Sequence, residues 1–168
     1  MKLEIGSGRK PTPGYVHVDA VEMEGVDVVD DGRVLREFQD ASASEIYCHW
    51  FLEHVARHEV APMLARWKAV LRPGGILRLV TNNHEAHNRC LADGEISWEE
   101  WSYLIYAVEN KRGYSVWDIH KCAWTQDMLT ETLVRCGFVD VDVTAQWQCR
   151  EEDGRLKCPA LVAEAVRP

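Results

Sequence analysis

Short polar segments follow the β-rich stretches at the start of the chain. Gly6-Ser7-Gly8 comes after the stretch 3–5, Asp19 after a second stretch and Asp30-Asp31 after a third. Glycine lets a backbone approach a ligand closely because it has no Cβ, and a carboxylate can accept two hydrogen bonds from a ribose diol. The combination indicates a ligand that contains adenosine. Glycines that only form a turn are the alternative for the first segment.

The residues after these glycines discriminate between adenosine ligands. A dinucleotide-binding fingerprint, Gly-x-Gly-x-x-Gly, needs a third glycine so that a helix can bring its N-terminus to the pyrophosphate. Pro11 occupies that position, and the two prolines within residues 9–14 disfavour a helix. The sequence also lacks the glycine-rich Gly-Lys-Ser/Thr pattern of a phosphate-binding P-loop. NAD and ATP are therefore disfavoured, and a ligand without phosphates is favoured.

Histidines are the candidate general bases, because an unperturbed imidazole titrates near neutral pH. His49 follows a β-rich stretch, His54 begins an amphipathic segment and His120 lies in a polar insert. A histidine that only packs beside the ligand is the alternative for His49, and no single base stands out. We take His49 and His120 as the catalytic candidates.

A metal site is the second kind of chemistry that the residue types allow. His84, His87 and Cys90 recur at three-residue steps, which would place them on one face of a helix where they could bind a soft divalent ion. A polar lid surface that carries these residue types by coincidence is the alternative, and we favour it. The same alternative applies to His54 and His58. We therefore expect no metal site.

Short β-rich stretches and helical patterns alternate along the chain. The stretches 3–5, 15–18, 26–29, 45–48 and 76–80 are apolar or β-branched and end in glycine or polar residues, as buried parallel strands tend to do. From Glu53 the apolar residues recur at steps of three and four, which predicts a helix with a kink or a fresh start near Pro62. Thr125 predicts the N-cap of another helix. Strands over 138–143 and roughly 156–166 follow, so the pattern predicts an α/β domain with a mostly parallel sheet.

Residues 82–124 form an insert that is polar, aromatic and rich in histidine. Seven aromatic residues lie between 98 and 124, and they could line an acceptor pocket or pack an extra layer or a dimer contact. Trp98 and Trp101 recur at a helical step, which favours packing. Tyr114 and Trp117 lie outside that pattern and are better pocket candidates. We expect this insert to act as a lid on the acceptor side of a single domain that spans residues 1–168.

Composition restricts the class of protein. The chain has 168 residues and a net charge of −8, which argues against sequence-independent binding to nucleic acids or anionic lipids. No apolar run approaches the about 20 residues that cross a bilayer, and the N-terminus has no apolar signal-peptide core. Six cysteines without a Cys-x-x-Cys pair predict reduced thiols in a cytoplasmic protein.

The order of these segments resembles the class I S-adenosylmethionine-dependent methyltransferases. The resemblance is carried by residues 3–8, Asp19, Asp31, the run 45–55 and the run 70–77. It extends over nearly the whole chain and is particularly similar to small bacterial predicted methyltransferases, in which a short loop replaces the first helix. It implies a Rossmann-like, mostly parallel sheet with helices on both faces and an antiparallel last strand. It also implies S-adenosylmethionine as the cofactor.

The resemblance implies contacts for the methionine and ribose parts of this cofactor. Gly6-Ser7-Gly8 and Glu4 would form the loop around the methionine moiety, with Glu4 reaching a water or the loop that holds the amino group. Asp19 would bind the ribose hydroxyls. Ala20 would lie against the adenine.

The resemblance also implies contacts for the adenine and the sulfonium. Asp31, next to Gly32, would accept a hydrogen bond from the adenine N6 amine, and Asp30 is the competing choice. His49-Trp50-Phe51 would line the sulfonium and the other face of the adenine. His54 belongs to an element of the family that more often organises a loop.

We therefore expect a cytoplasmic enzyme that transfers a methyl group from S-adenosylmethionine to a small-molecule acceptor, at oxygen or nitrogen. We expect no nucleic-acid and no membrane partner, and a homodimer is one way to close the site. The alternative is a non-catalytic S-adenosylmethionine-binding or interaction module that needs a partner subunit. The start of the chain directly at the first strand, without a preceding helix, fits that alternative.

Overall fold

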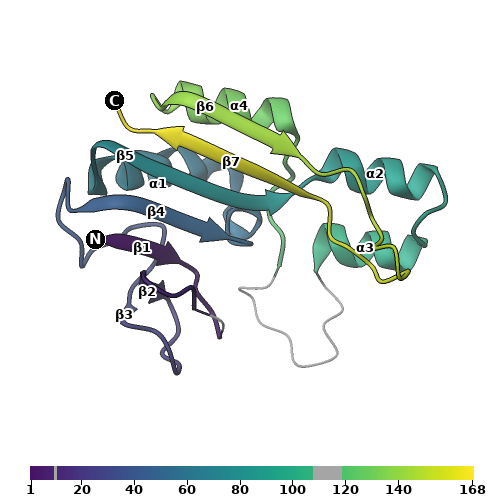
Figure 1. The fold of residues 1–168 in the computed structure, drawn as a ribbon, viewed down its shortest axis with the longest axis horizontal. Coiled ribbons are helices and arrows are strands. Elements are labelled where there is room, and N and C mark those ends of the chain that lie inside the picture. The colour runs from purple at the N-terminus through teal and green to yellow at the C-terminus, as the bar shows by residue number, and fades with distance from the viewer. Residues whose placement is uncertain (10, 108–118) are drawn as a thin grey trace.

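Seven strands form one sheet in the order β3-β2-β1-β4-β5-β7-β6 (Figure 1). They are β1 (Lys2–Ile5), β2 (Val16–Asp19), β3 (Val28–Val29), β4 (Ala43–His49), β5 (Leu71–Asn82), β6 (Val139–Ala145) and β7 (Ala160–Val166). Neighbours from β3 to β5 are parallel, and β7 is antiparallel to both β5 and β6. The predicted class, α/β with a mostly parallel Rossmann-like sheet and an antiparallel last strand, is confirmed.

The computed structural model describes residues 1–9, 11–107 and 119–168, so the pocket candidates Tyr114 and Trp117 lie outside the described residues. The helices are the 3-10 helix η1 (Leu52–His54), α1 (Arg57–Val70), α2 (His84–Ala92), α3 (Trp98–Tyr106) and α4 (Gln126–Arg135). No helix within the described ranges has the length and apolar character needed to span a bilayer.

The structure shows where the two long helices, α1 and α4, begin. The hydroxyl of Thr125 accepts a hydrogen bond from the Met128 N–H at 3.3 Å, which confirms the predicted N-cap of α4. The segment from Glu53 is instead divided into η1 and α1, and α1 continues through Pro62. The helix therefore starts afresh at Arg57, shortly before Pro62, and a kink at Pro62 stays a prediction. The buried side chains on either side of Pro62, Val60 and Met63, hold this part of α1 against the core.

The main core lies on one face of the sheet, beneath α1 and α4. Side chains alternate between the two faces of a strand, so Leu3 and Ile5 of β1 point to the same side. They join a hydrophobic cluster with Ile46, Leu77 and Leu79 from other strands, Val60, Leu64 and Trp67 from α1, and Leu129 and Leu133 from α4. In Figure 1 both helices lie behind the strands.

The expected helical layer on the other face is not found among the described residues. The connections that would supply it, 6–15, 20–27 and 30–42, contain no helical residue in their described parts. These connections are short and contain prolines and glycines with left-handed backbone, such as Gly14 and Gly25. The predicted short loop in place of the first helix is confirmed, and the described parts of these connections leave this face without helices.

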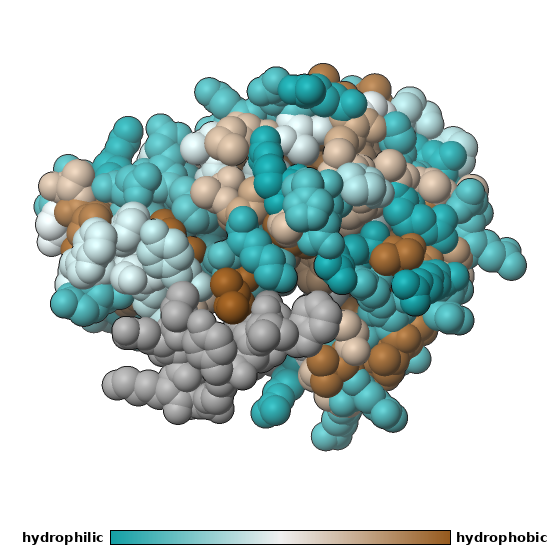
Figure 2. All heavy atoms as spheres, turned by 180° about the vertical axis from the view of Figure 1, so that it is seen from behind, coloured by the Kyte–Doolittle hydropathy of each residue, from teal (hydrophilic) through white to brown (hydrophobic). Residues whose placement is uncertain are grey.

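The uncovered face is polar. Glu45 of β4 pairs with Lys2 at 2.8 Å and with Arg78 at 3.7 Å, and Arg78 also pairs with Glu164 at 3.2 Å. The Tyr15 hydroxyl donates to the same glutamate. Figure 1 is seen from this side, whereas Figure 2 shows the helical side, which is mostly hydrophilic with hydrophobic residues in small patches.

Arg66 of α1 holds the connection between β3 and β4. Its guanidinium donates to the carbonyl oxygens of Val34 at 3.0 Å, Leu35 at 2.9 Å and Phe38, and it pairs with Asp40. The Arg66 side chain therefore anchors this connection to α1, and the connection itself contains no helical residue.

We predict that Arg66→Gln lowers the free energy of unfolding by about 1–3 kcal/mol, because hydrogen bonds from a charged donor to three carbonyls are lost. Urea denaturation measures the difference. Arg72→Gln, at an exposed position, is the control and should stay within about 0.5 kcal/mol of the parent. Equal stability of both variants would show that the contacts of Arg66 contribute nothing.

Candidate cofactor and acceptor site

A glycine loop at the end of β1 lies against the end of β2. Gly6 and Gly8 have φ values of +69° and +56°, a conformation that glycine adopts without strain. The Gly6 N–H donates to the carbonyl of Val18 at 2.8 Å, and the Gly8 N–H donates to Oδ2 of Asp19 at 3.1 Å. A Cβ at Gly6 would lie 2.8 Å from Cδ2 of Phe51. The structure thus brings together the loop, Asp19 and Phe51, as predicted.

Ser7 provides a test of whether this loop suits a ligand. Its side chain is buried, and Oγ has no hydrogen-bond partner among the residues that the structure describes. An unpaired buried hydroxyl costs about 1–3 kcal/mol, so such an atom indicates where a polar ligand group binds. It lies in the loop that was expected to surround the methionine moiety. The residues present therefore fit S-adenosylmethionine.

The Glu4 carboxylate binds the segment that follows the glycine loop. Its carboxylate is buried and accepts the Thr12 N–H at 2.7 Å and the Thr12 hydroxyl at 2.6 Å. His17 Nε2 lies 3.6 Å from the same carboxylate. These partners lie beyond the glycine loop, so the contacts expected for Glu4 with a water or with that loop stay predictions.

Two carboxylates lie near the end of β3, as expected for the adenine side. Asp31 is bound by the guanidinium and the N–H of Arg33, and these hydrogen bonds hold the pKa of Asp31 below its usual value. Asp30 is buried and accepts the Glu37 N–H at 3.0 Å. Both side chains already have partners within the chain, so the choice between them stays a prediction.

Gly32 and Phe51 link the two sides of the predicted cofactor site. A Cβ at Gly32 would lie 2.4 Å from Ile5 Cγ2 and 3.1 Å from Cζ of Phe51. The Phe51 ring therefore contacts both Gly32 and Gly6. A larger residue at either glycine position would displace the ring. Ala20, which was expected against the adenine, is exposed directly after β2.

The turn after β4 is strained. Trp50 has a φ of +53°, in the left-handed region, and its N–H donates to the Val80 carbonyl at 3.0 Å. A residue other than glycine in this region costs about 1–3 kcal/mol, and such residues cluster at functional sites. His49 is exposed, with its ring centroid 5.2 Å from that of Trp50. The two rings therefore lie side by side after β4, and their contact with the sulfonium stays a prediction.

A second polar group lies after β4 and at the end of β5. Glu53 of η1 is 1% exposed and accepts the Thr81 hydroxyl at 2.9 Å, and burial raises the pKa of Glu53 to about 7. The ring centroid of His120 lies 4.9 Å from that of His54. Burial, assisted by His54 and His84, lowers the pKa of His120 to about 4. This catalytic candidate therefore lies in a cluster that includes Glu53, which the sequence analysis did not select.

Asn82 also belongs to this cluster. Its Nδ2 lies 3.0 Å from His120 Nδ1 and 3.4 Å from the Leu104 carbonyl oxygen. The only signals in the sequence were a glutamate inside an apolar run and an asparagine at a strand end. Both are too common to identify a site without the fold.

Comparisons with known proteins agree with this arrangement. Residues 6–79 match the family described as a methyltransferase domain. Among solved structures, a SAM-dependent methyltransferase from Methanosarcina mazei matches with 19% identity and a TM-score of 0.69, covering 99% of this chain and 91% of that one. A SAM-dependent methyltransferase from Archaeoglobus fulgidus matches with 15% identity and a TM-score of 0.68, covering 98% and 85%. The chain folds as a class I methyltransferase domain.

A third structure has its ligands bound. The 1,6-didemethyltoxoflavin-N1-methyltransferase of Burkholderia thailandensis holds 1,6-didemethyltoxoflavin and S-adenosylhomocysteine, and it matches with 18% identity and a TM-score of 0.63, covering 98% of this chain and 69% of that one. A search of curated proteins found no match. The resemblance stated from the sequence is confirmed, and the predicted cofactor agrees with these comparisons.

The insert expected to act as a lid differs from expectation in its α2 helix. His84, His87 and Cys90 are buried, so the predicted polar lid surface is wrong for these three residues. Their helix packs against the connection between β6 and β7, where Cys90 forms a disulfide with Cys149. His87 Nε2 lies 3.8 Å from Sγ of Cys158.

The disulfide also corrects the expectation of six reduced thiols. The Cα atoms of Cys90 and Cys149 are 6.2 Å apart, within the usual range for a disulfide. Cys48, Cys122, Cys136 and Cys158 are free. The pair is 59 residues apart in the sequence, so spacing gave no indication of it.

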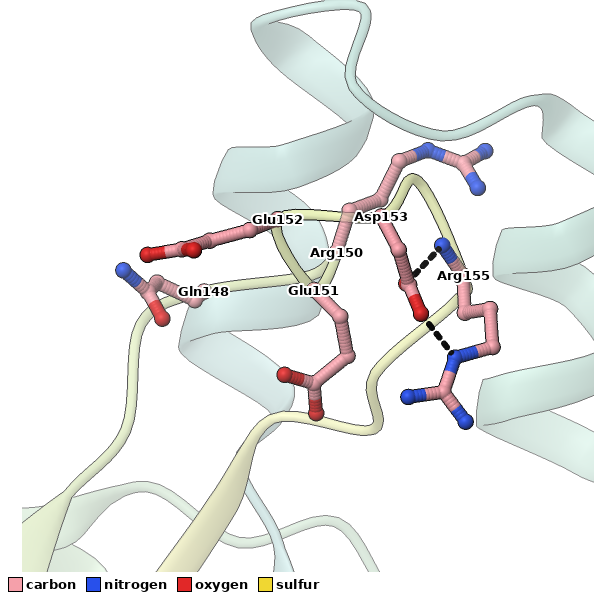
Figure 3. Close-up of a pocket in the computed structure, with 6 residues that line it drawn as sticks. All are labelled: Gln148, Arg150, Glu151, Glu152, Asp153 and Arg155. Carbon is pink, nitrogen blue, oxygen red and sulfur yellow. Dashed lines mark hydrogen bonds and ion pairs between the residues drawn. The ribbon is translucent and has the colours of Figure 1, made fainter.

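A cavity of about 500 Å³ lies on the loop between β6 and β7 (Figure 3). It is lined by Gln148, Arg150, Glu151, Glu152, Asp153 and Arg155. Arg155 pairs with Asp153 at 2.6 Å, and Arg150 pairs with Glu100 at 2.9 Å. This cavity contains none of the predicted site residues, and its arginines are already paired, so we do not assign the cofactor to it.

The burial of His87 predicts that the domain loses stability in mild acid. Burial, with smaller contributions from His84 and His120, lowers the pKa of His87 to about 3. Between this pKa and the ordinary value near 6.5, the unfolded chain binds more protons than the folded one. The stabilising contribution is therefore complete above pH 6.5 and decreases as the pH falls through this window.

From pH 7 to pH 5 we expect the wild type to lose about 2 kcal/mol of unfolding free energy relative to His87→Gln. Urea denaturation of both proteins at the two pH values measures this difference. His58→Gln, at an exposed position, should follow the wild type. A constant difference between the wild type and His87→Gln would contradict the low pKa.

Proposed function

We propose that this chain transfers a methyl group from S-adenosylmethionine to a small-molecule acceptor, at oxygen or nitrogen. The observation that carries the proposal is the buried Ser7 hydroxyl, which has no hydrogen-bond partner among the described residues and lies in the glycine loop of a class I methyltransferase fold. The glycine loop would hold the methionine moiety through its backbone and this hydroxyl. Asp19 would hold the ribose, and Phe51 and Trp50 would border the adenine and the sulfonium.

When bound, S-adenosylmethionine supplies an electrophilic methyl group. The protein must then hold an acceptor in line with that methyl group and remove the acceptor's proton. His49 and His120 are the candidates for accepting the proton. With a pKa of about 4, His120 is neutral at pH 7 and can accept a proton, although its low basicity makes it a weak base.

The overall charge of the chain favours a small acceptor over a nucleic acid. The net charge of −8 opposes the binding of a polyanion. We further propose that residues 1–168 act as one domain, with the insert 82–124 or a second subunit closing the acceptor side. A cytoplasmic location fits the four free cysteines, whereas the Cys90–Cys149 disulfide is at odds with a reducing compartment.

Calorimetric titration tests the cofactor directly. We expect binding of S-adenosylmethionine at one site per chain and no binding of NADH. Binding of NADH alone would refute the proposal. Formation of S-adenosylhomocysteine with a library of hydroxyl- and amine-bearing small molecules then separates an enzyme from a module that only binds the cofactor. Turnover by at least one acceptor supports the enzyme, and cofactor binding without any turnover supports the module.

We predict that Asp19→Ala weakens the binding of S-adenosylmethionine by about 1.5–3 kcal/mol, or about 10- to 150-fold in Kd. The variant loses the carboxylate proposed for the ribose and also the acceptor of the Gly8 N–H. Asp142→Ala, at an exposed position on β6, is the control and should bind like the wild type. Unchanged affinity of Asp19→Ala would mean that the cofactor binds elsewhere.

A further inference from the structure

Three side chains that commonly bind metal ions meet after β4 and beside the end of β5. Glu53 and His54 belong to η1, and His120 comes from the segment that precedes α4. One ligand atom of each lies within 4.8 Å of the other two. We propose that Glu53, His54 and His120 form a binding site for a divalent transition-metal ion. This inference revises the expectation, drawn from the sequence, that the chain has no metal site.

The carboxylate of Glu53 lacks a positive partner within the described part of the chain. Its side chain is 1% exposed, and its hydrogen-bond donor there is the neutral Thr81 hydroxyl. The buried carboxylate of Glu45, in contrast, pairs with Lys2 and Arg78. A buried carboxylate without a counter-charge is costly, and a divalent cation at this position would supply that charge.

The two imidazoles are oriented as metal ligands usually are. Nδ1 of His54 lies 3.2 Å from the Ile119 carbonyl oxygen, and Nδ1 of His120 lies 3.1 Å from the Leu104 carbonyl oxygen. A metal-binding histidine typically makes such a hydrogen bond with the ring nitrogen that does not bind the ion. The Asn82 amide nitrogen lies 3.0 Å from His120 Nδ1 and 3.4 Å from the Leu104 carbonyl oxygen, so ion binding through His120 Nε2 requires Nδ1 to donate to Leu104 and not to accept from Asn82.

The ligand types select the ion. Two imidazoles and one carboxylate suit Zn²⁺ and related first-row ions, whereas Mg²⁺ prefers oxygen ligands. Another group of ligand types, Cys90, Glu95 and Cys149, does not compete, because its two sulfurs are joined in the disulfide. Three protein ligands leave coordination positions open. On the basis of the proposed function, we infer an acceptor with an oxygen atom that can occupy one of them. With His120 holding the ion, His49 is then the candidate that accepts the acceptor's proton.

Metal titration of the full chain tests the site without relying on activity. Protein treated with a chelator and dialysed would be titrated with Zn²⁺ and, for its absorption spectrum, with Co²⁺. We expect one ion per chain, without the charge-transfer band of a thiolate ligand. We expect Glu53→Gln and His120→Gln to weaken binding at least about 10-fold. His58→Gln and Glu152→Gln, at exposed positions, serve as matched controls and should bind like the wild type.

Titration of the same samples with S-adenosylmethionine shows whether each variant is folded and tests the proposed function separately. A wild type that binds the cofactor but no ion would overturn the metal site alone. Equal ion binding by the wild type, Glu53→Gln and His120→Gln, or a thiolate band in the Co²⁺ spectrum, would also overturn it. Ion binding that is lost in both variants, in protein that does not bind the cofactor, would support the site and refute the proposed function.

Discussion

The parallel pairing of β1 with both β2 and β4 determines where the candidate side chains lie. Ile5 is paired with Val18 on one side and with Cys48 on the other, so the three strands end at one level. The next residues along the chain are the glycine loop, Asp19 and the strained turn at Trp50. A slip of one residue in either pairing would turn the buried side chains of that strand to the opposite face. Burial of one face of the strands therefore fixes their register, and this register brings the candidate site residues together.

Much of this arrangement could be predicted from local sequence. Each of the first strands is a short apolar stretch closed by glycine or aspartate, and parallel strands place such closing residues at one edge of a sheet. The cap at Thr125 also depends on neighbouring residues only. The uncovered face was missed because helices on both faces were inferred from a family resemblance, whereas the short connections of this chain contain no helix in their described parts.

The surroundings of Glu53 and His87 depend on contacts between distant segments, which a single sequence does not reveal. In the sequence, Glu53 looks like a polar residue on an amphipathic helix. It is buried because Thr81 and the segment around Lys121 approach it, and the Lys121 N–H donates to the Glu53 backbone carbonyl. His87 looks like a surface residue on α2. It is buried because the connection between β6 and β7 returns over that helix, and the apolar pattern of α2 gives no sign of that return.

The bond between Cys90 and Cys149 joins α2 to the connection before β7 across 59 residues. A cross-link between such distant points limits the freedom of the unfolded chain, so its loss would loosen that part of the domain first. The glycine loop is held by backbone hydrogen bonds to β2 and contains no sulfur. The α2 region would therefore respond to a reductant, whereas the glycine loop would not depend on the redox conditions.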